Sequence, residues 1–499
     1  MASNKPSKQK TKPAALAPKA NAAKLDWELY ANWALFAIYS LIVLYTVSNH
    51  EPWRDEAQSW LIARDNSLLG LFQYLPNEGH PPLWYLILMP FAKMGFSYAV
   101  VGYIHALIAI GCAWLILFKS RVPIYLRIAI IFSYFFLYEF AVIARNYSMV
   151  GLLLFAIVAI YEDRFKKPLL FGVLMFLLFQ TNVLAFCAGG GLGLIYLIEI
   201  IREKKFNPKI FASLAIMGLG AIATIALLLS AGMESDYTKI AADKMGAISS
   251  AFGNALLLNK DSGWGIVLYI LLALALFRKP MVLLFLAVGL AGYSYLVAYK
   301  FQGTLRHHGF LLTFLAAAYA LAMRYQPIKK FEKFKWIETG GAILFSLMLG
   351  VQALKGFNFV KEDWERTFSD AKNAAEFINR NQLYNYTIVG HRSYAASAVV
   401  PYLPDHKPVW YADQQRFGTF VYLDTTFFHN YMKYSSDYAP YIAQQKFSNL
   451  DSVILLLNAP IQHPEFLSRW DLIYRTMEQP IKGDEAFFIY KYHTDKNTN

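Results

Sequence analysis

Long apolar runs separated by short polar loops occupy most of the first 355 residues of the chain. A helix of about 20 apolar residues crosses a bilayer, because it satisfies its own backbone hydrogen bonds. The pattern therefore predicts a polytopic all-α membrane protein with about eleven transmembrane helices. The expected spans are residues 28–48, 97–118, 123–138, 142–161, 168–186, 188–201, 209–231, 264–277, 281–299, 309–324 and 336–354.

The segment PPLWYLILMPFAKMG, residues 81–95, is apolar but short, and Pro90 and Lys93 interrupt it. We interpret it as re-entrant or interfacial. Every basic loop then falls on the side of the Lys-rich N-terminus, so the positive-inside rule predicts a cytoplasmic N-terminus and an external C-terminus. These loops are residues 119–127, 163–167, 202–209, 278–279 and 324–335.

The chain changes character near residue 356, where apolar runs shorten and polar residues become frequent. We predict a helix at 368–380 and a few short strands. The expected strands lie in the segments 386–390, 407–412, 451–457 and 486–492. The expected domains are a disordered cytoplasmic tail (1–27), a transmembrane domain with juxtamembrane helices (28–355) and a small soluble extracytoplasmic α/β domain (356–499).

Composition agrees with a membrane protein, since 57% of the residues are hydrophobic and only 16% are charged. The net charge of +13 is spread over the short loops, which favours membrane topology over nucleic-acid binding. Cys112 and Cys187 both lie in apolar runs, so neither a disulfide framework nor a cysteine metal site is indicated. The glycine cluster AGGGLG (188–193) also lies in a span and indicates helix packing or a kink instead of a phosphate loop.

Polar residues that are costly near hydrocarbon collect at the outer ends of the expected spans. Such residues are tolerated where they face water or each other, so their convergence predicts a polar cavity open to the outside. They are Asp55 and Glu56 in EPWRDEAQSWLIARDN (51–66), Glu78 and His80 in NEGHPPLWY (77–85), Glu139, Arg145 and Tyr147 in YEFAVIARNYS (138–148), QTN (180–182), the loop 232–244, and Arg306, His307 and His308 in TLRHHG (304–309).

Each of these groups also has a structural interpretation. Asp55 is a possible helix N-cap, with Gln58 completing a capping box. Glu139 and Arg145 are a possible ion pair, and the 304–309 stretch a possible interfacial helix start. Joint occurrence of acids, histidines and arginines on one face favours a functional site.

The order of these motifs resembles that of the GT-C superfamily of membrane glycosyltransferases. A span, an external Asp-Glu pair opening a juxtamembrane helix, HPPL (80–83) and ARNYS (144–148) follow one another within residues 28–200. Protein O-mannosyltransferases and the aminoarabinose transferase of lipid A are nearest in pattern. The resemblance implies a GT-C fold and transfer of a sugar from a polyprenyl-phosphate carrier to an acceptor hydroxyl on the extracytoplasmic face.

Within that reaction, Asp55 is the expected general base, and Arg306 is the expected cation on the lipid phosphate. The helix after Asp55 is expected to lie in the interface, with Trp60 and Leu61 toward lipid. The remaining candidates are Glu56 and Glu139 as catalytic residues and Glu78, His80, Arg145, Tyr147, His307 and His308 as substrate-binding residues. If a cofactor is used, Asp55 and Glu139 suit Mg²⁺ or Mn²⁺.

The expected partners are a polyprenyl-phosphate-linked sugar donor, an acceptor protein, lipid or glycan, and membrane lipids, without nucleic acid. The expected location is the bacterial inner membrane, with undecaprenyl phosphate as carrier. A transporter or flippase remains an alternative, although it predicts charges near the middle of several spans. A non-enzymatic scaffold is a third interpretation.

Overall fold

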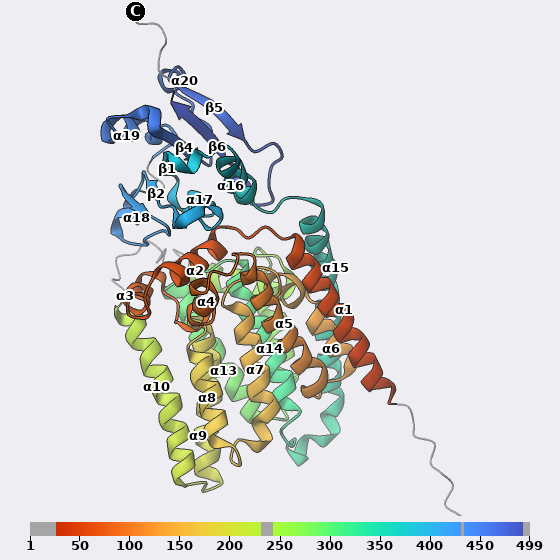
Figure 1. The fold of residues 1–499 in the computed structure, drawn as a ribbon. Coiled ribbons are helices and arrows are strands. Elements are labelled where there is room, and N and C mark those ends of the chain that lie inside the picture. The colour runs from red at the N-terminus through yellow and green to blue at the C-terminus, as the bar shows by residue number, and fades with distance from the viewer. Residues whose placement is uncertain (1–25, 231–242, 431–433, 493–499) are drawn as a thin grey trace, which may run out of the picture.

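The computed structural model describes residues 26–230, 243–430 and 434–492. A bundle of helices carries a small sheet domain at one end (Figure 1). The predicted tail (1–27) lies almost wholly outside the described residues, as does the loop 232–244.

Six helices of the described chain are long and apolar enough to cross a membrane, which is typical of a polytopic integral membrane protein. They are α1 (Trp27–Asn49), α5 (Val100–Lys119), α9 (Val183–Arg202), α10 (Pro208–Ser230), α13 (Pro280–Tyr299) and the segment Lys329–Glu365, which contains α15 (Lys335–Glu365). The bundle is completed by α6 (Ile124–Phe132), α7 (Tyr147–Ile160), α8 (Pro168–Phe179), α11 (Lys244–Leu257), α12 (Trp264–Leu274) and α14 (Leu305–Ala322).

Each of the eleven predicted apolar runs overlaps one of these helices, but several boundaries differ: α9 starts at Val183, α14 starts at Leu305 and α15 ends at Glu365. The largest change of course lies between α6 and α7. Within the run 123–138, the α-helix ends at Phe132, and a short π-helix, Phe135–Glu139, follows it. Residues 140–146 then leave helical geometry, so α7 starts later than the predicted residue 142. This break keeps Glu139 and the arginine of ARNYS at the same end of the bundle.

Helix α11 was not predicted, because its sequence KMGAISSAFGNALL lacks a long apolar run. Its small residues let it pack closely against α12, α13, α14 and α15. Close packing also explains the glycine cluster in α9. A Cβ atom on Gly191 would come within 2.6 Å of the carbonyl oxygen of Phe285 on α13, so a side chain there would separate the two helices.

The basic loops gather at the end of the bundle away from the sheet domain. Arg121 pairs with Glu162 at 2.8 Å, which joins the loop after α5 to the end of α7. Arg127 pairs with Glu28 at 2.8 Å, which brings the start of α6 to the start of α1.

The other end of the bundle holds three short helices, α2 (Arg54–Asp65), α3 (Leu68–Glu78) and α4 (Leu83–Lys93). α4 corresponds to the segment interpreted as re-entrant or interfacial, and it packs against α2. Trp60 and Leu61 of α2 are buried in a hydrophobic core shared with the C-terminal domain. The expectation that these two side chains face lipid was therefore wrong, because the sheet domain covers the helix.

The C-terminal domain contains a six-stranded sheet with the order β3-β2-β1-β4-β6-β5. Strand β1 (Thr387–His391) lies parallel to β2 (Val409–Tyr411) and β4 (Val453–Leu457). The other strands pair antiparallel: β3 (Arg416–Gly418), β5 (Trp470–Arg475) and β6 (Phe488–Tyr492).

The four predicted strands are confirmed as β1, β2, β4 and β6, and the predicted helix is α16 (Ala371–Arg380). β3 and β5 were not predicted, since β3 is only three residues long and β5 is largely exposed at the sheet edge. Helix α15 continues beyond residue 356 to Glu365, so the last long helix leads directly into the sheet domain (Figure 1).

Candidate active site

Asp55 lies in the first turn of α2, at the end of the bundle covered by the sheet domain. The helix begins after Trp53, whose backbone N–H donates to Glu56 Oε2 at 3.0 Å. Glu56 therefore closes the capping box, and the interpretation of Asp55 as N-cap with Gln58 was wrong. The Gln58 side chain instead forms two hydrogen bonds with the backbone of Val421 in the C-terminal domain.

Arg306, at the start of α14, joins the two carboxylates predicted for the site. Its Nη1 lies 3.0 Å from Asp55 Oδ2, and its Nε lies 3.4 Å from Glu139 Oε1. The hydroxyl of Tyr134 donates to the other oxygen of Glu139 at 2.7 Å. Asp55, Glu139 and Arg306, here called the arginine cluster, thus come from three distant parts of the chain. The expected pair between Glu139 and Arg145 does not form.

Electrostatics keep Asp55 ionised. Burial alone would raise the pKa of Asp55, but the cations around it, chiefly Arg145 and Arg306, lower this pKa to about 2. The Asp55 side chain keeps 34% of its surface exposed, so it is reachable from solvent. An ionised carboxylate that reaches solvent is available to accept a proton, although so low a pKa makes it a weak base while Arg306 is bound to it.

Arg145 lies beside the arginine cluster but forms no ion pair with the carboxylate of Asp55 or Glu139. Its Nη1 donates to the backbone oxygen of Asp55 at 2.6 Å, and its Nη2 lies 3.3 Å from Nε2 of His80. Burial and the charge of Arg145 lower the pKa of His80 to about 3, so the imidazole is neutral. Its Nε2 then accepts from Arg145. Its Nδ1 is buried and has no hydrogen-bond partner among the described residues.

Glu78 belongs to a neighbouring network instead of the arginine cluster. It accepts hydrogen bonds from Gln58 at 2.8 Å, Tyr74 at 3.1 Å and Tyr85 at 3.2 Å. Burial raises the pKa of Glu78, and these donors oppose the rise. The network joins α2 to α3 and α4 through Glu78.

The two histidines after Arg306 face different surroundings. His307 Nδ1 accepts from the backbone N–H of Thr304 at 3.0 Å, so its Nε2 carries the proton and donates to Tyr147 at 3.2 Å. His308 points elsewhere, since its nitrogens lie 2.9 Å from the Asn254 amide nitrogen and 3.1 Å from the Gln302 carbonyl oxygen. The structure brings Tyr147 and His307 together, but it does not bring His308 to the arginine cluster.

Glu56 is turned away from Asp55 into the protein. Its Oε1 accepts the backbone N–H of Ala144 at 2.6 Å, and its Oε2 lies 3.2 Å from Nε2 of His50. The other His50 nitrogen lies 2.8 Å from Asp363 Oδ2. Both carboxylates outweigh the effect of burial and raise the pKa of His50 to about 10. Glu56 thus anchors α2 through a buried imidazolium, which differs from the catalytic role expected for it.

Sequence reasoning missed two residues next to the arginine cluster. The Trp53 ring stacks with the Arg306 guanidinium 4.7 Å from its centroid, and Nζ of Lys482 lies 4.2 Å from the same centroid. Lys482 belongs to the C-terminal domain, more than 400 residues from Trp53 in sequence. The only local signal for Trp53 was its place beside Asp55.

The residues expected to hold Mg²⁺ or Mn²⁺ do not form a preformed metal site. Arg306 occupies the space between Asp55 and Glu139, so the two carboxylates already share a cation. In the described part of the chain, no group of three or more His, Cys, Asp or Glu side chains is arranged to hold a metal. The geometry fits a carboxylate pair bridged by arginine.

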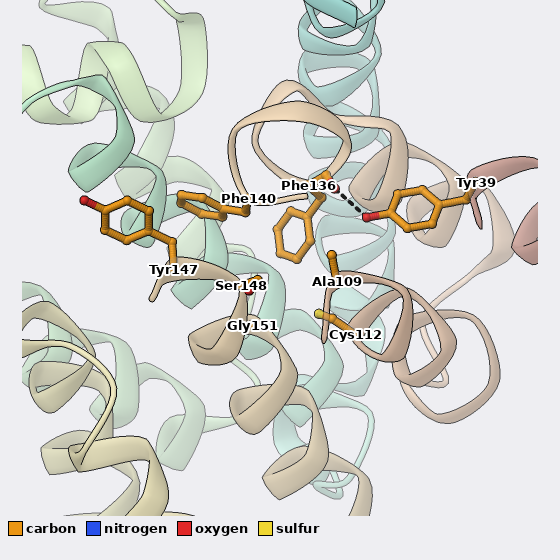
Figure 2. Close-up of a pocket in the computed structure, with 8 residues that line it drawn as sticks. All are labelled: Tyr39, Ala109, Cys112, Phe136, Phe140, Tyr147, Ser148 and Gly151. Carbon is orange, nitrogen blue, oxygen red and sulfur yellow. Dashed lines mark hydrogen bonds between the residues drawn. The ribbon is translucent and has the colours of Figure 1, made fainter. Parts of the chain in front are cut away.

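A small cavity lies in the bundle next to Tyr147, between α1, α5, α7 and the π-helix (Figure 2). Aromatic and small side chains line it, and the Tyr39 hydroxyl donates to the Phe136 carbonyl oxygen at 2.7 Å beside it. Its volume of about 10 Å³ holds no more than about one water molecule. A sugar therefore does not bind in this cavity.

Comparison with models of known protein families found no match to this chain, and comparison with curated proteins found no relative. The resemblance to GT-C glycosyltransferases therefore remains a prediction from motif order.

Proposed function

We propose that this chain is a GT-C glycosyltransferase that transfers a sugar from a polyprenyl-phosphate carrier to an acceptor hydroxyl. The observation that carries the proposal is the arginine cluster, in which Arg306 bridges Asp55 and Glu139. Such a cluster combines a proton acceptor with a cation for the leaving phosphate. These are the two groups that glycosyl transfer from a lipid phosphate needs.

The proposed orientation places the arginine cluster on the extracytoplasmic side of the bacterial inner membrane. The paired basic loops lie at the opposite end of the bundle, and positive loops favour the cytoplasm. In this proposal the chain crosses the membrane eleven times, which puts its two ends on opposite sides. The sheet domain then lies outside the membrane, above the site.

In the proposed reaction, the donor phosphate competes with Asp55 and Glu139 for Arg306. A guanidinium binds two phosphate oxygens at once, so the exchange is favourable in charge and geometry. As Arg306 turns to the phosphate, Asp55 loses a cation that lowers its pKa and becomes a better base. Asp55 therefore becomes an effective base only when a donor is bound.

Asp55 then accepts the proton of the acceptor hydroxyl while the hydroxyl oxygen attacks the anomeric carbon. The bond between that carbon and the phosphate oxygen breaks, and the polyprenyl phosphate leaves with the electron pair. Arg306 and Arg145 stabilise the extra negative charge on the phosphate. In this proposal the hydrogen-bonded pair of Tyr147 and His307 lies on the sugar side of the arginine cluster.

The transporter or flippase alternative explains the geometry less well. A transport path needs polar groups near the middle of the bundle, on more than one helix. The cluster residues instead gather at one end, beneath the sheet domain, and Glu56 and Glu78 hold that end together. This arrangement favours a reaction at a fixed place over movement through the protein.

Reconstituted protein supplied with an undecaprenyl-phosphate sugar and an extract of envelope acceptors tests the proposal. We expect free undecaprenyl phosphate to form in step with labelled acceptor, because breaking the sugar–phosphate bond defines the reaction. The matched control is Arg306→Ala. Movement of the intact lipid-linked sugar across the bilayer, without release of undecaprenyl phosphate, would favour the flippase.

A further inference from the structure

The C-terminal domain reaches the arginine cluster through the segment that precedes β6. The Arg54 side chain pairs with Asp484 at 2.6 Å, and the Arg54 backbone N–H donates to Glu485 at 2.9 Å. These bonds hold residues 482–485 against the start of α2. Lys482 is thereby fixed over the Trp53 ring, beside Arg306.

Lys482 is a cation without a carboxylate partner. Among the described residues its ammonium contacts the rings of Trp53, at 4.2 Å, and Phe368, at 5.2 Å, and it forms no hydrogen bond or ion pair. Burial and the neighbouring Arg306 lower the pKa of Lys482, so holding its charge there costs free energy. A bound anion would offset that cost.

The Trp53 ring gathers three cations. The guanidinium carbons of Arg54 and Arg306 lie 4.8 and 4.7 Å from its centroid, and Nζ of Lys482 lies 4.2 Å from it. Asp484 and Glu485 bind Arg54, and Asp55 and Glu139 bind Arg306, so among the described residues Lys482 alone of the three has no carboxylate at ion-pair distance. An anion beside Lys482 and Arg306 would therefore meet a cation that no carboxylate holds.

Two buried donors near these cations also lack an acceptor. The Trp53 side chain belongs to a residue only 5% exposed, and its indole N–H has no hydrogen-bond partner in the described chain. The Nδ1 of His80, next to Arg145, is also buried and has no hydrogen-bond partner among the described residues. Buried donors without partners are uncommon in proteins, and an oxyanion ligand would satisfy them.

We infer that Lys482 binds the phosphate of the lipid-linked donor, so that the C-terminal domain supplies one of the cations of the site. This inference rests on the proposed function. The C-terminal domain would then both cover the donor site and contribute a residue to it. Because Arg54 clamps the segment, loss of domain docking and loss of Lys482 would both weaken donor binding.

Equilibrium binding of undecaprenyl phosphate to the full chain in nanodiscs tests the inference. Lys482→Met keeps the apolar stem on Trp53 but removes the charge, and we expect binding to weaken about 10- to 100-fold, as for loss of a charge-assisted hydrogen bond. Lys482→Arg should bind within a few-fold of wild type. Lys491→Met is the matched control, because Lys491 also lies over an aromatic ring of this domain, at 5.0 Å from that of Tyr386.

Salt dependence gives a second readout that does not depend on the amount of folded protein. Wild-type binding should weaken more steeply with added salt than binding by Lys482→Met. Wild-type affinity and salt slope in Lys482→Met would overturn the inference and leave the proposed function standing. Failure of the wild type itself to bind undecaprenyl phosphate, or equal binding of inorganic phosphate, would instead overturn the proposed lipid donor, and the inference with it.

Discussion

The buried imidazolium of His50 makes the most quantitative prediction. His50 sits between Glu56, at 3.2 Å, and Asp363, at 2.8 Å, and so ties α2 to the end of α1 and to α15. Raising its pKa from 6.5 to about 10 corresponds to on the order of 5 kcal/mol of stabilisation at most. Replacing His50 with Gln removes the cation and leaves two buried carboxylates together, which typically costs about 3–5 kcal/mol.

The pH dependence has a definite sign. A group whose pKa is raised in the folded protein stabilises it fully below the unfolded pKa, here 6.5, and this contribution is lost as pH rises through the folded value of about 10. We therefore expect the wild-type thermal midpoint to fall between pH 7 and pH 10 more than that of His50→Gln. Titration of lysines and tyrosines is common to both proteins and cancels in the difference.

Thermal unfolding in detergent, followed by intrinsic fluorescence from pH 6 to 10.5, measures this difference. At pH 7, His50→Gln should unfold several degrees below wild type. His463→Gln serves as the control, because His463 is exposed and should leave both midpoint and pH profile unchanged. Identical pH profiles for wild type and His50→Gln would refute the assignment of a buried imidazolium.

Three further predictions address topology and the arginine cluster. A cysteine placed at Gln382 should be labelled by a membrane-impermeant reagent in intact cells and one at Lys330 should not; the reverse pattern would invert the proposed orientation. Arg306→Ala should slow turnover about 100- to 1,000-fold and Arg306→Lys should recover part of it, whereas unchanged kinetics in both would remove Arg306 from the site. Glu56→Gln should lower the thermal midpoint more than Asp55→Asn, because Glu56 binds His50 and two backbone amides; equal midpoints would contradict its anchoring role.

The length of the apolar runs predicted most helices of the bundle, because run length is a local property of the chain. The break at residues 140–146 and the whole of α11 escaped prediction. Both depend on packing between helices. α11 packs against its neighbours through small residues, and its sequence contains no long apolar run from which a helix could be predicted.

The sequence predicted which residues belong to the candidate site better than it predicted which of them pair. The predicted topology of the spans placed Asp55, Glu139 and Arg306 at one end, and the structure joins them. The sequence carried no signal that Arg306 would bridge both acids. Partners contributed by distant segments, such as Lys482 beside Trp53, leave no local pattern and need the folded chain to be seen.

The central claim is that Asp55 is the base of a glycosyl transfer, and single-turnover release of undecaprenyl phosphate tests it most directly. Asn has nearly the size of Asp but does not accept the proton. Wild type should release the carrier, and Asp55→Asn should do so about 100- to 10,000-fold more slowly while still folding and binding undecaprenyl phosphate. Release by Asp55→Asn at the wild-type rate would contradict the account.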